Sequence, residues 1–384
     1  MSEVAQVTHS SPDGHIPQLR FPQFSHDWAI STIGNLAKID TGNRDTQDRV
    51  NSGKYPFYVR SNTVERINEY AFDGEAILTS GDGVGVGKNF HYVVGKFNYH
   101  QRVYSIHNFT NSTNGKFIYY YFADKFYRRV SRLSAKNSVD SVRMSMISDM
   151  PISIPAKPEQ QKIAEFLTAV DNKIEQLSKK QELLSEYKKG LMQQIFSQAI
   201  RFKADDGSDF PDWEEKRLGG CILENQKSQI QVNFVSDNTE RDDVNIYPFF
   251  TSGNKALFTD SPIVEGDNIF LSTGGIATIN FYSGKGSYST DVFCISSVSE
   301  NTRFIYYYLL SILIKIDRKL FYGSGLKHLD KKAFRKIITT LPALPEQTKI
   351  ANFLSSVDSK IEQVGKQLDE SKQFKKALLQ RMFV

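Results

Sequence analysis

Two stretches of this chain repeat apolar residues at alternating intervals of four and three. Such a pattern, sustained over several heptads, predicts a long α-helix with one narrow apolar stripe. Because so narrow a stripe suits another helix better than a broad domain surface, we expect the two helices to pair as an antiparallel, left-handed coiled coil. The seam residues of the two predicted helices are Ile163, Leu167, Val170, Ile174, Leu177, Leu184 and Leu191, and Ile350, Leu354, Val357, Ile361, Val364, Leu368 and Leu378.

Polar residues interrupt both stripes. Gln181 and Lys188 stand at seam positions in the first helix, and Ser371 and Lys375 in the second. Polar seam residues weaken a coiled coil but can fix its register. An alternative is that each helix packs only on its own domain.

The two helices also share their sequence. Pro158-Glu159-Gln160 opens a 19-residue segment that returns 187 residues later at Pro345-Glu346-Gln347, with 14 identities. Fainter matches follow the same order, such as residues 55–58 with 247–250 and 117–122 with 304–309. A repeat of nearly half the chain indicates two similar units with approximate two-fold symmetry.

The pattern in the rest of each unit predicts strands, turns and one buried helix. Short β-branched and aromatic runs between Gly, Asn and Asp clusters predict strands at 76–79, 91–94, 102–106, 269–272 and 292–295. The stretches 117–127 and 304–316 predict buried helices, in which the tyrosines belong to the core. We therefore expect an α+β fold with two similar α/β domains separated by the two long helices. The expected boundaries are a disordered tail at 1–17, domains at 18–155 and 201–342, and helices at 156–200 and 343–384.

Composition places few limits on the partner. The 384 residues are 40% hydrophobic and 24% charged, with a net charge of +5, which permits a polyanionic partner without requiring one. Cys221 and Cys294, both in strand-like stretches, are the only cysteines, so no disulfide framework is expected. The sequence contains no signal-peptide core and no apolar run as long as a membrane span, and we expect a cytoplasmic protein.

The motifs that suggest catalysis fail on inspection. In the run from Gly81 to Lys88, Asp82 stands where a phosphate-binding loop needs Gly, so a turn between strands is the better interpretation. The acids of Pro211–Lys216 adjoin in sequence, whereas nuclease acids converge from separate strands. The histidines at 91, 100 and 107 lack metal-ligand spacing. We expect a non-catalytic chain that holds no metal or cofactor of its own.

Polar loops occupy similar places in both units and are candidates for contact with DNA. Their side chains can hydrogen-bond to phosphates or to base edges. In the first unit the candidates are Arg60, Ser61, Asn62, Ser80, Asp82, Lys88, His100, Gln101, Arg102, Lys136, Asn137 and Arg143. In the second they are Ser252, Asn254, Ser272, Thr273, Lys285, Ser289, Thr290, Ser324, Lys327 and His328.

The doubled Pro-Glu-Gln segment carries a family resemblance. With the flanking runs 19–24 and 210–213, and the helix ends 188–196 and 375–383, the chain resembles the specificity subunits of type I restriction-modification systems. The resemblance covers nearly the whole chain.

The resemblance implies that each domain reads one half of an asymmetric, bipartite site in double-stranded DNA, with the coiled coil as the spacer. It also implies two docked modification subunits that bind S-adenosylmethionine and methylate adenine, and restriction subunits that use ATP and magnesium. Since the loops differ between the units, the two half-sites should differ. The alternatives are a stand-alone DNA-binding nuclease and a coiled-coil adaptor that binds only protein.

Overall fold

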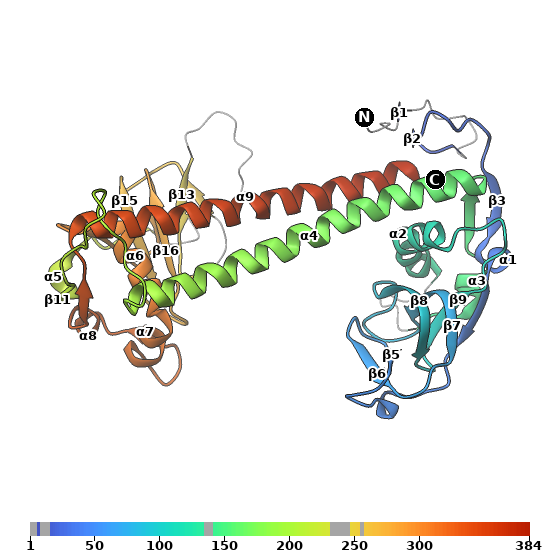
Figure 1. The fold of residues 1–384 in the computed structure, drawn as a ribbon, viewed down its shortest axis with the longest axis horizontal. Coiled ribbons are helices and arrows are strands. Elements are labelled where there is room, and N and C mark those ends of the chain that lie inside the picture. The colour runs from blue at the N-terminus through green and yellow to red at the C-terminus, as the bar shows by residue number, and fades with distance from the viewer. Residues whose placement is uncertain (1–5, 8–15, 134–140, 231–245, 254–256) are drawn as a thin grey trace. The chain divides into compact units, whose positions relative to one another are not determined.

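The chain forms two compact units, each of which takes part of both long helices (Figure 1). The computed structural model describes residues 6–7, 16–133, 141–230, 246–253 and 257–384. The first unit comprises residues 1–178 and 366–384, and the second comprises residues 179–365.

The first unit is built on a six-stranded sheet with the order β4-β9-β7-β8-β5-β6. All neighbours in it are antiparallel except β5 and β8, which run parallel. Two further strand pairs, β1 with β2 and β3 with β10, lie outside it. The strands are β1 (Gln6–Val7), β2 (Leu19–Arg20), β3 (Ala29–Thr32), β4 (Lys38–Thr41), β5 (Tyr55–Tyr58), β6 (Val64–Ile67), β7 (Phe72–Ser80), β8 (Phe90–Tyr99), β9 (Val103–His107) and β10 (Pro151–Ile154).

Strand β7 is buried on both faces. Successive side chains of a strand point to opposite faces, and Ile77 packs into the core under the helices while Ala76 and Leu78 join a cluster on the other side. The helices of this unit are α1 (Ile33–Leu36), α2 (Gly115–Leu133) and α3 (Met144–Ser148), with a 3₁₀ turn, η1 (Thr46–Asp48). Helix α2 buries Phe117, Tyr120 and their neighbours, as predicted for its aromatic run.

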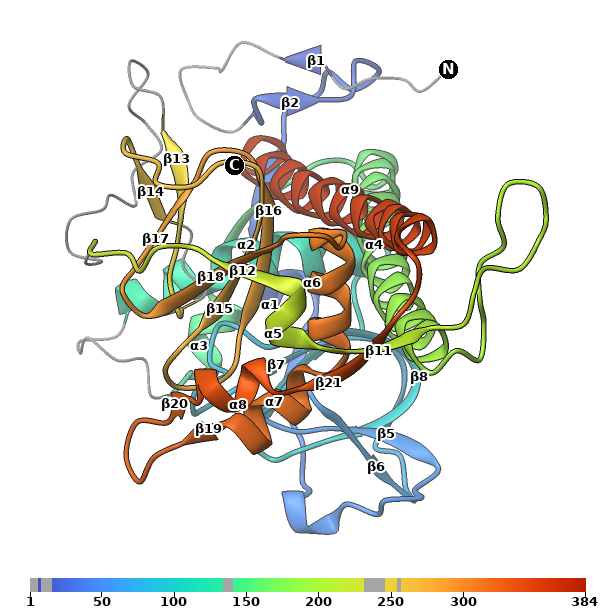
Figure 2. The ribbon, with the colours of Figure 1, turned by 90° about the vertical axis from the view of Figure 1, so that its left-hand side faces the viewer.

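The second unit repeats this plan with smaller sheets. Its four-stranded sheet has the order β12-β18-β15-β16, and α6 packs against β15 and β16 (Figure 2). The strands are β11 (Glu214–Arg217), β12 (Ile222–Glu224), β13 (Tyr247–Phe250), β14 (Leu257–Thr259), β15 (Asp267–Ser272), β16 (Ile279–Ser283), β17 (Ser287–Tyr288), β18 (Val292–Ser297), β19 (Phe321–Tyr322), β20 (His328–Leu329) and β21 (Ile338–Leu341). The helices are α5 (Leu218–Cys221), α6 (Thr302–Ser311), α7 (Leu313–Leu320) and α8 (Lys331–Arg335).

Two local predictions in the second unit were wrong. The stretch 304–316 forms two helices rather than one, because Ile312 between them leaves the helical conformation with φ −107° and ψ 10°. Cys221 ends the short helix α5 instead of lying in a strand, whereas Cys294 does lie in β18. Both thiols are buried and free.

The long helices are α4 (Lys157–Phe196) and α9 (Leu344–Met382). In the first unit the start of α4 packs with the end of α9, where Ile163 and Leu167 share a core with Leu378 and Met382. In the second unit the end of α4 packs with the start of α9, through Ile195, Ile350 and Leu354. The pairing is therefore antiparallel within each unit, and the expected fold class is confirmed. In the part of the chain that the structure describes, we find no helix with the length and apolar character of a membrane span.

Candidate nucleic-acid interface

Three connections of the first unit meet at one end of its sheet. The Gly81 N–H donates a hydrogen bond to the Arg102 carbonyl at 2.7 Å, and the His100 N–H donates to the Tyr58 carbonyl at 2.9 Å. A third bond, from Asn89 Nδ2 to the Arg60 carbonyl at 3.0 Å, closes the group. We call these segments the first loop cluster: residues 59–63, 81–89 and 100–102. The predicted turn from Gly81 to Lys88 lies here, between β7 and β8.

Arginines and one carboxylate dominate the first loop cluster. Arg60 Nη1 lies 3.0 Å from Asp82 Oδ1, and Arg102 Nε lies 3.8 Å from Asp82 Oδ2. Arg143 joins them, because the N–H of its neighbour Val142 donates to the Gly81 carbonyl at 2.7 Å. The cluster thus presents exposed guanidinium groups beside a carboxylate, a set that can bond to phosphates and to both purine and pyrimidine edges.

The second unit holds an equivalent group of segments, the second loop cluster, with the same backbone bonds. It comprises residues 251–253, 273–278 and 289–291. The Thr273 N–H donates to the Asp291 carbonyl and the Ser289 N–H to the Phe250 carbonyl, both at 2.9 Å. The Leu329 N–H donates to the Thr273 carbonyl at 3.0 Å, as Val142 does to Gly81 in the first unit.

The side chains on this common backbone differ sharply in charge. In the second unit, Ser252 stands at the place of Arg60, Asp291 at that of Arg102 and Asp330 at that of Arg143. The two clusters therefore present different hydrogen-bonding groups from the same scaffold.

Four of the predicted contact residues are buried, which are Ser80, His100, Ser272 and Ser289. Ser272 Oγ donates to the Ile276 carbonyl and accepts from the Thr278 N–H, both at 2.9 Å, so it holds its turn in place. His100 Nδ1 accepts from the Arg102 N–H at 2.9 Å, and burial lowers the pKa of its imidazole, which favours this neutral acceptor. Ser272 and His100 therefore support the loops, and all four side chains are withdrawn from the surface.

The other predicted residues are more accessible. Lys88 lies 5.9 Å from the centre of the Tyr127 ring, Gln101 donates to Asp45 at 2.9 Å, and Ser61 donates to the Thr63 carbonyl at 3.3 Å. Further exposed or partly exposed candidates are Asn62, Lys285, Thr290, Ser324, Lys327 and His328. Lys136, Asn137 and Asn254 lie outside the described residues.

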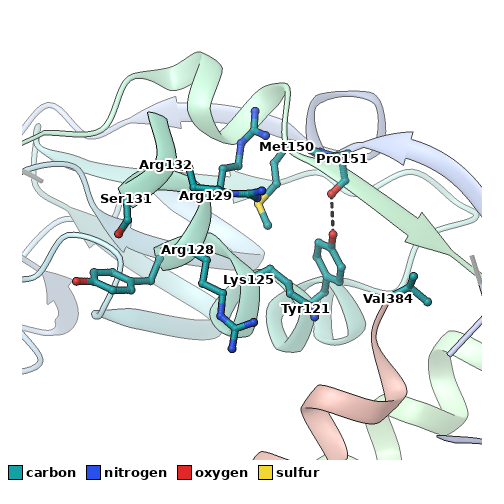
Figure 3. Close-up of a pocket in the computed structure, with 10 residues that line it drawn as sticks. Tyr121, Lys125, Arg128, Arg129, Ser131, Arg132, Met150, Pro151 and Val384 are labelled. Carbon is teal, nitrogen blue, oxygen red and sulfur yellow. Dashed lines mark hydrogen bonds between the residues drawn. The ribbon is translucent and has the colours of Figure 1, made fainter. Parts of the chain in front are cut away.

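A basic cavity of about 630 Å³ adjoins the first loop cluster (Figure 3). Figure 3 shows Lys125, Arg128 and Arg132 of α2 around it, together with Tyr121, whose hydroxyl donates to the Pro151 carbonyl at 2.7 Å. Tyr127 connects the two regions, because it packs against Gly87 of the β7–β8 turn. Sequence reasoning missed Lys125 and Arg128 of this basic group, since they lie on a helix whose aromatic run dominates its pattern.

Across the described ranges, no group of three or more His, Cys, Asp or Glu side chains is arranged to hold a metal ion. Arg129, in the cavity wall, already donates hydrogen bonds to the Met146 carbonyl at 2.8 Å and to the Asp149 carbonyl at 2.9 Å.

Buried polar residues of the Pro-Glu-Gln segment tie the long helix to the first domain. Glu159 pairs with Arg20 at 2.7 Å and accepts from the Trp28 indole at 3.3 Å. Gln160 Oε1 accepts from the Asn114 N–H at 2.8 Å, and Asn114 in turn accepts from the Phe117 N–H at the start of α2.

The second unit reproduces this connection. Glu346 pairs with Arg201 at 2.8 Å, and Gln347 Oε1 accepts from the Asn301 N–H at 2.9 Å. Asn301 then caps α6 through the Phe304 N–H. The identity of both Glu-Gln pairs in the repeat was the available signal for this role, which sequence reasoning had assigned only to the helix pair.

A second duplicated contact fixes the helix pair against each domain. Asp171 accepts from the Tyr120 hydroxyl at 2.9 Å and pairs with Lys375 at 2.6 Å. In the second unit, Asp358 accepts from the Tyr307 hydroxyl at 2.6 Å and pairs with Lys188 at 2.6 Å. The lysines that interrupt the apolar stripes are therefore ion-pair partners.

The duplication found in the structure agrees with a family comparison. The family model for the type I restriction modification DNA specificity domain matches residues 25–185 and again 211–370. This chain belongs to that family. Each match contains one domain together with much of the long helix that follows it.

Relatives and a solved structure fit the same family. The chain is 27% identical over 205 residues to the type I restriction enzyme EcoDI specificity subunit of Escherichia coli, an alignment that spans 53% of this chain and 44% of that protein. It is 24% identical to the MjaVIII specificity subunit of Methanocaldococcus jannaschii, over 94% of this chain and 92% of that one. A crystal structure of a type I restriction-modification S subunit from M. genitalium shares the fold with a TM-score of 0.73, at 17% identity over 96% of this chain and 99% of that chain.

Proposed function

We propose that this chain is the DNA-sequence-specificity subunit of a type I restriction-modification complex. Each unit reads one half of an asymmetric, bipartite duplex site through its loop cluster. The paired helices set the spacing between the half-sites and dock two modification subunits. The observation that supports this most directly is one backbone scaffold, present twice in the chain, that carries Arg60, Arg102 and Arg143 in one copy and Ser252, Asp291 and Asp330 in the other.

The chemistry of modification and cleavage belongs, in this proposal, to other subunits. Modification subunits bind S-adenosylmethionine and methylate adenine, and restriction subunits use ATP and magnesium. The role of this chain is to select the site in the cytoplasm. Exposed arginines position the protein on phosphates and read base edges, while the buried Ser272 and His100 side chains help to keep the loops in a fixed shape.

The test is an exchange of one recognition domain. The chain is expressed with its modification subunits in a host that lacks adenine methylation, and methylated motifs are mapped by sequencing. Residues 18–155 are then replaced by those of a relative with a different target. The relative that supplies the domain should have an aromatic residue at the position of Phe117, because Phe117 packs against Phe383 with ring centres 5.4 Å apart.

We expect the exchange to change one half of the methylated motif and leave the other half and the spacing intact. The matched control exchanges residues 201–342 and should change only the other half. Absence of any bipartite motif that depends on this chain, or a change in both halves after one exchange, would contradict the proposal.

Binding to duplex DNA separates this proposal from a protein-only adaptor. Because arginine contacts release counterions from phosphates, the logarithm of the affinity should fall linearly with the logarithm of the salt concentration. An isolated chain that cleaves DNA when magnesium is added would instead support a stand-alone nuclease.

A further inference from the structure

Each loop cluster carries one fully presented apolar side chain at the tip of a turn. Val84, between β7 and β8, is 97% exposed, and Ile276, between β15 and β16, is 76% exposed. They occupy equivalent positions, since each directly follows a glycine in the left-handed region, Gly83 with φ 75° and Gly275 with φ 78°. The left-handed glycine lets the chain turn so that the next side chain projects outward.

The backbone beneath both tips is held in place. In the first unit the Val86 N–H donates to the Gly83 carbonyl at 3.1 Å. In the second, the Gly275 N–H donates to the Lys327 carbonyl at 2.9 Å, and Ser272 holds the Ile276 carbonyl. Neither apolar side chain belongs to a hydrophobic cluster of its unit, so folding gives no reason for an apolar residue at these two points.

Charged and polar groups belong to the same segments as both tips. Arg60 and Arg102 pair with Asp82, two residues before Val84. Lys327 and His328 pair with the turn that carries Ile276. At the second tip another exposed aliphatic side chain, Leu326, lies near Gly274 of the same turn. Exposed aliphatic groups among hydrogen-bonding groups match one feature of the DNA grooves. Among the base edges of the major groove, the 5-methyl group of thymine is the apolar one.

We propose that Val84 and Ile276 determine specificity by contacting the 5-methyl group of a thymine, one in each half-site. This inference rests on the proposed function and deepens it. A branched side chain of this size covers one methyl group in the major groove, whereas apolar side chains that wedge between base pairs act from the minor groove. The mixed charges around Val84 also suit the major groove, where base edges both donate and accept.

The experiment combines a protein variant with a DNA variant. The full chain in complex with its modification subunits is titrated with a duplex that contains its mapped motif. Each thymine of one half-site is replaced in turn by deoxyuridine, which lacks only the methyl group. The variants V84A and I276A are measured on the same duplexes, with V94A and V298A as controls, because these valines are 70% and 69% exposed on other segments.

We expect deoxyuridine at one position of one half-site to raise the Kd of the wild-type complex about fourfold, the effect of exposing one methyl group. V84A should bind the unmodified duplex about as weakly as the wild-type complex binds the deoxyuridine duplex. Deoxyuridine at that position should not raise the Kd of V84A any further. I276A should behave in the same way for the other half-site only. The controls V94A and V298A should keep both the affinity and the deoxyuridine effect.

Several outcomes would overturn the inference. The first is a deoxyuridine effect that persists in V84A and I276A, and another is a half-site in which no deoxyuridine replacement changes the Kd of the wild-type complex. A wedge would give a different result. 2-Aminopurine placed in the half-site would then become brighter when the wild-type complex binds, because its base is unstacked, and V84A would abolish this increase in fluorescence. Loss of the modification subunits on purification of V84A would assign the tip to a protein contact. Failure of the wild-type complex to prefer its motif over unrelated DNA would overturn the proposed function itself.

Discussion

At the scale of single residues, the two glutamates of the repeated segment form ion pairs that differ in the solvent exposure of the arginine. Glu159 and Glu346 both lie in the first turn of a long helix, where the helix dipole favours a negative charge. Both are buried, but their arginine partners differ. The Arg20 side chain is 4% exposed, whereas that of Arg201 is 25% exposed. The first pair is thus cut off from water and the second is not.

We expect Glu159→Gln to lower the free energy of unfolding of the first unit by about 3–5 kcal/mol, since it leaves the buried Arg20 charge without an opposite charge. Glu346→Gln should cost the second unit less, about 1–2 kcal/mol, because water can reach Arg201. Urea unfolding followed by tryptophan fluorescence can separate the units, since Trp28 and Trp213 are the only tryptophans. The first unit is followed in a Trp213→Phe background and the second in a Trp28→Phe background.

The exposed Glu175 supplies the control, and Glu175→Gln should leave both unfolding curves unchanged. Equal losses for Glu159→Gln and Glu346→Gln would show that the exposure of the arginine does not decide the cost.

At the scale of elements, α4 and α9 are defined by their apolar stripes, but polar contacts attach them to the domains. The heptad positions predicted from the sequence are buried or partly buried in both helices. Lys375 and Lys188 interrupt the stripes and each pair with an aspartate that also accepts from a tyrosine of the domain helix. Each ion pair can form only in one alignment of the two helices, so it selects a register that apolar contacts alone leave less well defined.

A double-mutant cycle between Asp171→Asn and Lys375→Met should give a coupling free energy of about 0.5–1 kcal/mol, the range for partly exposed ion pairs. The cycle between Asp358→Asn and Lys188→Met should give a similar value in the second unit. Stability is read from the same fluorescence-monitored unfolding. Pairing Asp171→Asn with Lys376→Met, which changes a neighbouring exposed lysine, should give no coupling. A coupling no larger than this control would remove the ion pair as a determinant of register.

At the scale of the whole molecule, one backbone plan serves two different surfaces. Three backbone hydrogen bonds that hold the first loop cluster recur in the second, while the charge at three equivalent positions changes from basic to neutral or acidic. In such an arrangement the scaffold and the recognised sequence can vary independently. The length of α4 and α9 is then a third variable, which we expect to act on the spacing alone.

Insertion of one heptad into each long helix tests that expectation. The sites are the Ser178–Lys179 bond in α4 and the Gln367–Leu368 bond in α9, which leave both ion pairs in register. Seven residues add about 10 Å to a helix, which corresponds to about three base pairs of DNA. Methylation mapping should return a motif with both half-sites unchanged and a longer spacer.

A variant in which the same heptad replaces existing residues, without added length, should keep the original spacer. An unchanged spacer in the lengthened protein would show that the helices do not measure the distance.

Much of this fold could be predicted from local pattern. The strands at 76–79, 91–94 and 269–272 lie within β7, β8 and β15, because a period of two and turn residues act over a few positions. The break at Ile312 could not be predicted in this way. An apolar run continues through it, and only the backbone angles of Ile312 in the folded chain reveal the break.

The sequence by itself determined the duplication, the two long helices, the family and the loops that differ between the units. These properties are carried by residues close together in the chain or by direct comparison of its halves. Only the tertiary structure decided that Ser80, His100, Ser272 and Ser289 lie beneath the loops, that Glu159 and Gln160 anchor a helix, and that Val84 and Ile276 stand at the tips. Burial depends on which distant segments fold over a residue, and a polar side chain in a loop has the same local pattern whether it faces solvent or the core.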